Sequence, residues 1–433
     1  MIEFHVAFIA LLLGTQAFFT ALAIKNVSYA DRTVTEKTAW LKETLDIEDH
    51  NELLNYHRIT TAASQLQTWI GLGVLFVVLY SGLFTEIVTL LAATGIDPVL
   101  QGILFFVGLI IAAQLFSLPF AVLRTFGIEE IFGFNNQTPT LFIRDKLVGT
   151  AVSIVFVGLI AGAILWFIQA FPTWWWVAGW ALVIGFSLTM QIIYPRVIAP
   201  LFNEFTPVED GELKAGVEDV FDRAGFSCEQ IYTMDASRRS SHLNAYFTGF
   251  GETKRVVLFD TLVDRMTLPA VQSVLAHELA HWKKSHIWKQ IASSAIQMAI
   301  VFALLGVLVN YEPLYALFGV PETATYAGLL LAVLIVGPIM ELTSPITNKL
   351  SLKHEREADA FAVSVMDDGQ PMIDALSALA RENLANPFPH PTYAAFHYSH
   401  PPIPERIRLI EERMEREHRA DEHDTTGVAP GDD

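Results

Sequence analysis

Cysteine is almost absent from this sequence: Cys228 is the single cysteine among 433 residues. One thiol cannot form an internal disulfide, and it excludes a metal site built mainly from cysteine. Charged residues are also scarce at 17%, whereas hydrophobic residues make up 52%. The formal net charge of −18 argues against nucleic acid as a partner, because nucleic acid is itself strongly negative. The composition instead indicates a protein that crosses a lipid bilayer several times.

Seven apolar runs have close to the roughly 20 residues that a membrane-spanning helix needs. They cover residues 4–24, 69–91, 101–122, 147–168, 174–193, 291–309 and 327–342. The first run lacks a basic leader and a small-residue cleavage site, so we expect a retained membrane helix and not a signal peptide. The last run is interrupted by Pro338 and Glu341. We predict a mainly α-helical, multi-pass membrane protein.

Lysine and arginine are distributed unevenly between the polar connections. Residues 25–65, 123–146, 196–289 and 349–356 contain them, whereas the short loops 92–100, 169–173 and 310–324 contain none. The positive-inside rule then places the N-terminus outside the cell membrane and the C-terminus in the cytoplasm. The same rule places the polar segment between the fifth and sixth spans on the cytoplasmic side.

The polar segments suggest a division of the chain. Residues 1–200 hold five spans with their cytoplasmic loops, residues 201–290 form the main polar segment, and residues 291–348 hold the last two spans. Residues 349–419 are predicted to be helical apart from a proline-rich loop at 386–404, and residues 420–433 to be a disordered acidic tail. Within the main polar segment we predict a helix at 210–224 and a small sheet from strands at 230–234, 245–250 and 254–259.

The most informative stretch is His277-Glu278-Leu279-Ala280-His281, which matches H-E-x-x-H. On a helix, His277 and His281 share one face, so both imidazoles can bind one Zn²⁺. Glu278 can then take a proton from a water molecule at the metal. We predict a helix here, because Thr267 can cap it and Pro269 suits its first turn.

A catalytic zinc needs a third protein ligand and an open position. The segment 351–362 offers candidates, because Glu355 and Asp359 share a face at helical spacing. One carboxylate can bind zinc, and the other can accept the N–H of a ligand histidine. His354 and Glu357 in the same segment remain alternatives.

Taken together, the motifs resemble those of the type I CAAX prenyl proteases, which are integral-membrane zinc metalloendopeptidases, and more distantly those of the HtpX-like proteases. The matching stretches, which occur in the same order and at the same spacing, are His277-Glu278-Leu-Ala-His281-Trp282, Glu355-Arg-Glu-Ala-Asp359-Ala-Phe-Ala, Ser399-His400-Pro401-Pro402 with Arg406, and Phe132-Gly-Phe-Asn135-Asn-Gln137-Thr138. The resemblance covers most of the chain from about residue 120.

The resemblance implies a zinc site and gives roles to the residues around it. Glu355 would be the third zinc ligand and Asp359 its supporting carboxylate. His400 would stabilise the oxyanion or donate a proton, and Arg406 would hold the carboxylates in place. The resemblance also implies seven helices that enclose a chamber, capped by a zincin-like protease domain with a small sheet. The implied activity is removal of the C-terminal tripeptide from prenylated proteins.

A predicted strand directly upstream of the motif helix is a candidate for substrate binding. Asn244, Ala245, Tyr246 and Phe247 open this strand, and in zinc peptidases an exposed strand edge pairs with the substrate backbone. A plain structural hairpin is the competing interpretation.

Other functions compete with the prenyl protease. A general membrane-protein quality-control protease fits the same motifs. A metal-ion transporter would place its ligands within the spans, where Glu86 and Glu341 are the main ionisable residues. A scaffold without activity is the third alternative. His286 is expected to lie off the ligand face, at the membrane interface. The roles of His242 and Asn348 and the oligomeric state stay open.

Overall fold

The computed structural model describes residues 2–226, 230–248 and 255–425 of the chain. The chain divides into two compact units, each assembled from three segments. We call the first the membrane unit; it comprises Met1–Lys25, Arg58–Phe202 and Ile291–Pro345. We call the second the polar unit; it comprises Asn26–His57, Asn203–Gln290 and Ile346–Asp433. Cys228 and parts of two predicted strands lie outside the described residues.

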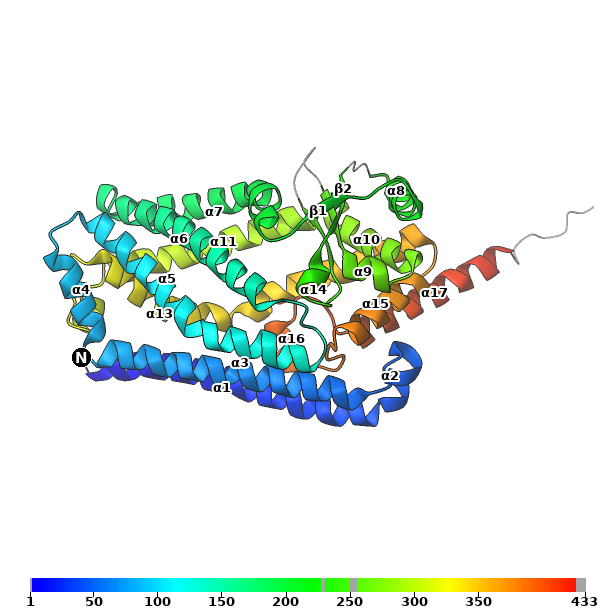
Figure 1. The fold of residues 1–433 in the computed structure, drawn as a ribbon, viewed down its shortest axis with the longest axis horizontal. Helices are drawn as coiled ribbons and strands as arrows, with labels where there is room; N and C mark the ends of the chain where they lie inside the picture. The colour runs from blue at the N-terminus through cyan, green and yellow to red at the C-terminus, as the bar shows by residue number, and fades with distance from the viewer. Residues whose placement is uncertain (1, 227–229, 249–254, 426–433) are drawn as a thin grey trace, which may run out of the picture. The chain divides into compact units, whose positions relative to one another are not determined.

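The described residues contain seven helices that are long and apolar enough to cross a membrane. They are α1 (Ile2–Glu36), α3 (His50–Tyr80), α5 (Pro98–Leu123), α6 (Pro139–Ala170), α7 (Trp175–Ile193), α11 (His286–Val309) and α13 (Thr325–Leu342). Helices α5, α6 and α7 pack against one another in sequence order (Figure 1). The membrane unit has its own apolar core, with Trp175 and Tyr326 fully buried in it. The predicted mainly helical, multi-pass fold is confirmed.

The predicted second span, residues 69–91, is wrong in its bounds. Helix α3 begins at His50 and ends at Tyr80, and a separate helix, α4, covers Leu83–Ala93. Gly82 lies between them with a φ of 88°, a left-handed conformation that glycine adopts at little cost. Hydrophobicity continues across this break, so an apolar run alone cannot reveal it. The dipeptide Ser81-Gly82 is the turn signal that marks the break.

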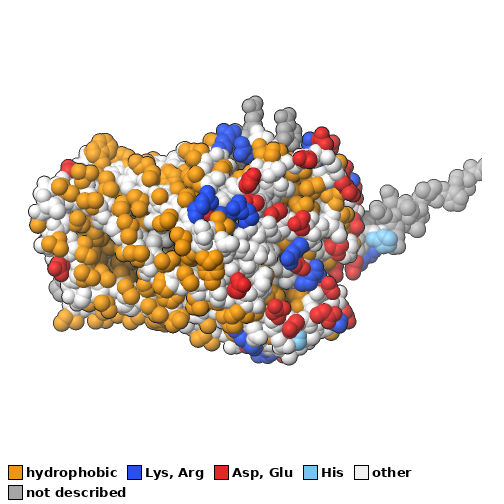
Figure 2. Space-filling model, viewed as in Figure 1, with side chains coloured by type: hydrophobic (Ala, Val, Ile, Leu, Met, Phe, Trp, Pro, Cys, Tyr) orange, Lys and Arg blue, Asp and Glu red, His pale blue; other side chains and the backbone are white. Residues whose placement is uncertain are grey.

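The surface of the membrane unit is unusually apolar. Large hydrophobic side chains such as Leu115, Leu159 and Val307 are well exposed on its helices. Figure 2 shows hydrophobic side chains dominating the face formed by α4 to α7. Such a surface would be unfavourable in water, and it is the surface that lipid tails cover.

One glycine in the membrane unit permits a close packing contact. A Cβ added to Gly328 in α13 would lie 2.1 Å from Oη of Tyr315 in α12 (Glu312–Ala316). Tyr315 is buried, and its hydroxyl donates a 2.8 Å hydrogen bond to the carbonyl oxygen of Val309. There is no room for a methyl group unless this tyrosine moves.

Gly328→Ala is therefore expected to lower the free energy of unfolding by about 1–3 kcal/mol, the usual cost of overpacking. The matched control is Gly337→Ala in the same helix, because an added Cβ there meets nothing within 4 Å. Thermal unfolding in detergent measures both. Equal melting temperatures for the two variants would contradict the prediction.

The polar unit contains a four-stranded mixed sheet in the order β1-β2-β4-β3. Strand β2 (Ile231–Met234) pairs in parallel with β4 (Arg255–Phe259), and β3 (Ala245–Thr248) pairs with β4 in antiparallel fashion. The sequence predicted these three strands. It missed β1 (Phe205–Pro207), which pairs antiparallel with β2 and has only three residues. A strand this short shows no alternation that could be recognised.

The remaining helices of the polar unit are α2 (Thr38–Leu45), α8 (Glu212–Ala224), α9 (Asp260–Arg265), α10 (Leu268–Lys283), α14 (Ser344–Met366), α15 (Gln370–Glu382), α16 (Pro391–His397) and α17 (Ile403–Thr425). Helix α10 packs against α8 and α15. Helix α17 continues through residues 420–425, where a disordered tail was expected, and residues 426–433 lie outside the described part.

Candidate metal centre

Helix α10 carries the H-E-x-x-H motif and is held by its apolar face. Val271, Leu275 and Leu279 are almost fully buried in the core of the polar unit. Because an α-helix turns about 100° per residue, His277 and His281 lie on the side opposite these residues. Thr267 occupies the N-cap position and Pro269 follows in the first turn, although the threonine side chain makes no capping hydrogen bond.

The two histidines and Glu355 converge on one point. Nε2 of His277 lies 3.4 Å from Nε2 of His281. The carboxylate of Glu355 lies 3.3 Å from His277 Nε2 and 3.5 Å from His281 Nε2. Among the described residues, His277, His281 and Glu355 form the one group whose ligand atoms lie close enough together to hold a metal ion.

The spacing of these atoms fits a tetrahedral zinc ion. With bonds of about 2.0 Å, ligand atoms at tetrahedral angles lie about 3.3 Å apart, close to the three distances observed. Two imidazoles and one carboxylate are also a donor set that catalytic zinc sites use. The residues present therefore fit the cation.

Asp359 and Arg406 support His277 from behind. Nδ1 of His277 lies 2.8 Å from Oδ1 of Asp359, so the N–H at Nδ1 donates to the carboxylate and Nε2 points toward Glu355. Arg406 binds the same carboxylate through two hydrogen bonds, from Nε at 2.9 Å and from Nη2 at 2.6 Å. Both side chains are buried, so the paired charges shield one another in a site that little water reaches.

The charges of the site suit a cation. Burial raises the pKa of Asp359, but Arg406 and His277 more than offset it and hold the pKa well below its usual value. Burial likewise raises the pKa of Glu355, whereas hydrogen bonds from His277 and His400 hold the pKa far below normal. Two carboxylates thus stay ionised beside the histidines.

The two histidines titrate differently. Burial lowers the pKa of His277, but its hydrogen bonds to Asp359 and Glu355 outweigh burial and raise the pKa to about 9. Burial, followed by the neighbouring His277, lowers the pKa of His281 to about 4. Metal binding at Nε2 would therefore displace a proton from His277, whereas His281 is already neutral.

Glu278 follows the first histidine on α10 and is partly buried. Burial, together with the charge of Glu355, raises its pKa, while His277 opposes this rise. A carboxylate with a raised pKa accepts a proton more readily, which is the property that a general base needs.

His400 lies in the loop before α17 and reaches the site from outside. Its Nδ1 lies 2.5 Å from Oε2 of Glu355. The side chain is 60% exposed, so an incoming group can reach it. The structure thus brings His400 to Glu355 itself, at the edge of the site.

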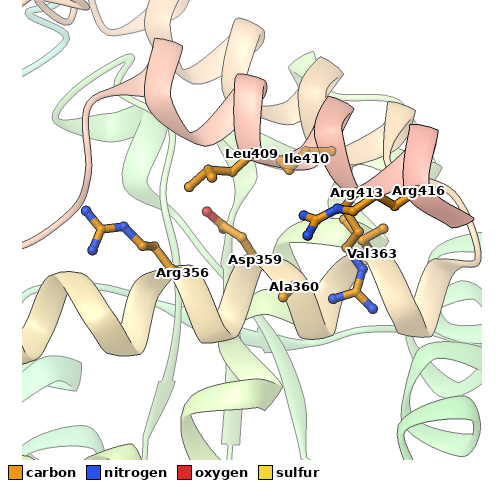
Figure 3. A pocket seen from close by; sticks show the side chains of 8 residues that line it. All are labelled: Arg356, Asp359, Ala360, Val363, Leu409, Ile410, Arg413 and Arg416. Carbon is orange, nitrogen blue, oxygen red and sulfur yellow. The ribbon is translucent and has the colours of Figure 1, made fainter.

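A cavity of about 470 Å³ lies between α14 and α17, next to Asp359. Figure 3 shows Arg356 and Asp359 on α14 below it, and Leu409, Ile410 and Arg413 on α17 above it. None of the three candidate ligands lines this cavity. The cavity therefore borders Asp359, which supports His277, and not the candidate metal ligands.

The predicted substrate strand, β3, is one of the two edge strands of the sheet. β3 ends the strand order, and it packs beside α10. Asn244 is exposed, whereas Ala245 is buried. Tyr246 packs on Phe259 and Phe247 on Phe221, on opposite faces of the sheet. Both aromatic side chains are therefore engaged in packing within the polar unit.

As expected, His286 is not among the three residues grouped to hold a metal ion, and it is the first residue of the candidate membrane span α11. Its side chain is fully buried and lies against His281, with 3.2 Å between their Nδ1 atoms. Helix α10 ends at Lys283, and Ser285 has a φ of 58°, so His286 begins the new helix α11. The chain therefore changes direction between His281 and His286.

Glu357 and His354 are further neighbours that helical spacing did not single out. Oε2 of Glu357 lies 3.0 Å from Nε2 of His286, and the ring of His354 stacks on that of His286. The sequence left the roles of Asn348 and His242 open, and both side chains make hydrogen bonds within the polar unit. Asn348 donates to the carbonyl oxygens of Ala395 and Phe396, and His242 contacts Asn383.

Comparison with known proteins identifies the family. A family model described as the CAAX prenyl protease N-terminal domain with five membrane helices matches residues 28–204, and the Peptidase family M48 model matches residues 207–414. CAAX prenyl protease 1 homolog from Arabidopsis thaliana is 37% identical over 73% of this chain and 76% of its own. The chain belongs to the M48 family of CAAX prenyl proteases.

Other relatives agree with this assignment. CAAX prenyl protease 1 from Saccharomyces cerevisiae is 33% identical over 86% of this chain and 87% of its own. The crystal structure of S. mikatae Ste24p matches with a TM-score of 0.83 and 30% identity, covering 93% of this chain and 98% of that one. The resemblance inferred from the motifs is confirmed. As a member of this family, the protein is a multi-pass membrane metallopeptidase.

Proposed function

We propose that this protein is a zinc endopeptidase that cleaves next to a prenylated cysteine near the C-terminus of its substrate. The convergence of His277, His281 and Glu355 within bonding reach of one zinc ion carries the proposal. The prenylated substrate is suggested by the names of the relatives, which are CAAX prenyl proteases.

In this mechanism, His277, His281 and Glu355 would hold the zinc ion, which when bound would supply a water molecule of lowered pKa and a Lewis acid for the scissile carbonyl. Glu278 takes the proton of the attacking water and passes it to the leaving amine. His400, at the edge of the site, stabilises the oxyanion or donates a proton, and Arg406 holds Asp359 and through it His277. Asn244 and Ala245 present the edge of β3 to the substrate backbone.

The active site is proposed to face the cytoplasm and the N-terminus to lie outside the cell membrane. The distribution of lysine and arginine along the sequence supports this orientation. The seven helices would then enclose the chamber that the family resemblance implies.

The metal-ion transporter is disfavoured. His277 and His281 lie on α10 and Glu355 on α14, and neither helix is among the candidate membrane spans. A transporter would be expected to hold its ion near the middle of the membrane.

The test uses purified full-length protein in detergent, with one zinc per chain checked by metal analysis. A farnesylated CAAX peptide and an unmodified peptide of equal length are each incubated with and without a zinc chelator, and mass spectrometry locates the cuts. We expect chelator-sensitive cleavage after the prenylated cysteine. Equal cleavage of both peptides would replace this proposal with the general quality-control protease. No cleavage by zinc-loaded protein would refute both.

A further inference from the structure

The two candidate histidine ligands are supported in different ways. His277 meets a carboxylate directly, with 2.8 Å between its Nδ1 and Asp359 Oδ1. His281 has a histidine in the equivalent place, with 3.2 Å between its Nδ1 and Nδ1 of His286. The other nitrogen of His286, Nε2, lies 3.0 Å from Oε2 of Glu357. His281 thus reaches a carboxylate through one intervening imidazole.

The contacts allow one arrangement of protons when His281 binds a metal through Nε2. A lone pair at Nε2 requires the hydrogen of a neutral imidazole to be on Nδ1, so His281 donates to His286. Nδ1 of His286 must then accept, which places the hydrogen of His286 on Nε2. That hydrogen points to Glu357, whose carboxylate can only accept when ionised. Every donor in this hydrogen-bonded series from His281 through His286 to Glu357 therefore meets an acceptor.

The packing around His286 keeps this chain in place. Its side chain is 0% exposed, and its ring stacks on His354 at 4.1 Å with an angle of 9° between the planes. Three helices supply the residues of this hydrogen-bonded series: α10 carries His281, α11 begins at His286, and α14 carries Glu357. The ring of His286 is thus held in both plane and position.

We propose that His286 and Glu357 are positioning residues for His281, which hold the tautomer and ring orientation that zinc binding requires. This inference rests on the proposed zinc site of His277, His281 and Glu355. Partners that accept the second N–H of a ligand histidine typically contribute 10–100-fold to metal affinity. Here that contribution is divided over a histidine and a carboxylate that act in series.

The test measures zinc affinity by competition with a chromogenic chelator on the full-length protein in detergent. We expect His286→Ala to weaken binding about 10–100-fold, and Glu357→Ala to weaken it by about 10-fold. Glu357→Gln should fall between wild type and Glu357→Ala, because its amide oxygen still accepts the hydrogen bond without the charge. The matched control is Lys353→Gln, which removes an exposed charge 3.8 Å from Glu357 and should leave affinity unchanged.

A double variant shows whether Glu357 acts on His281 through His286 or whether the two residues act independently. If Glu357 acts through His286, His286→Ala with Glu357→Ala binds zinc as weakly as His286→Ala alone. The absorption spectrum of the Co²⁺-substituted protein gives a second readout, because a tilted His281 ring changes the ligand field. Glu357 is partly exposed, so its variants remain informative even if His286→Ala fails to fold.

Two results would overturn the inference while leaving the zinc peptidase standing. One is wild-type zinc affinity and an unchanged Co²⁺ spectrum in Glu357→Ala. The other is additive losses in the double variant. A wild-type protein that binds no zinc at all would instead refute the proposed function on which the inference rests.

Discussion

Glu278→Gln is expected to lose peptide cleavage by about 10²–10⁴-fold or more while zinc stays bound. The amide has nearly the shape of the carboxylate but cannot take a proton from water. The three candidate ligands are untouched, so zinc content should remain at one per chain. Cleavage of the farnesylated peptide under single-turnover conditions, with metal analysis of the same sample, measures both quantities.

The matched control for Glu278→Gln is Glu218→Gln. Glu218 is an exposed residue on α8 of the same unit, so this variant makes the same chemical change away from the metal centre. It should cleave at the wild-type rate. Cleavage by Glu278→Gln at the wild-type rate would show that another group, such as His400, is the base.

Arg406→Ala is expected to cause the largest loss of stability, about 3–5 kcal/mol, together with loss of zinc. Arg406 is 8% exposed, and both oxygens of Asp359 accept its hydrogen bonds. Removing it leaves a buried carboxylate without its main counter-charge, and Asp359 is the group that orients His277. Thermal unfolding in detergent and metal analysis measure the two losses.

Arg408→Ala is the control for Arg406→Ala. Arg408 lies two residues further along α17, is exposed, and pairs with Glu412 at the surface. Exposed ion pairs contribute roughly 0–1 kcal/mol, so this variant should unfold near the wild-type temperature. If the two variants had the same melting temperature, Arg406 would contribute no more to stability than an exposed arginine, and the prediction would be wrong.

Membrane topology is the part of the fold that was most accessible from the sequence. A run of about 20 apolar residues has few alternatives to a membrane helix, because lipid leaves no partner for an open backbone. The helix ends were less accessible. Gly82 separates α3 from α4 without any fall in hydrophobicity, and its left-handed conformation is a local backbone property.

Short strands were the other difficulty. β1 has three residues, and it exists because β2 lies beside it to accept and donate its hydrogen bonds. Such a strand depends on partner residues 25 to 29 positions further along the chain, which no local pattern encodes. The longer β4, with Val256, Val257 and Leu258 buried, was evident from its composition.

The sequence by itself determined the membrane-spanning class, the helix of the H-E-x-x-H motif and the pairing of its two histidines, because these follow from runs and spacings within one element. Only the tertiary structure placed Glu355 opposite them, joined Asp359 to Arg406, and buried His286 between His281 and Glu357. Except for the contact between His281 and His286, these contacts join helices that lie far apart in the chain. They form because the apolar faces of α10, α14 and α17 pack in one unit. Periodicity fixes what one helix presents, whereas burial in a shared core decides which helices meet.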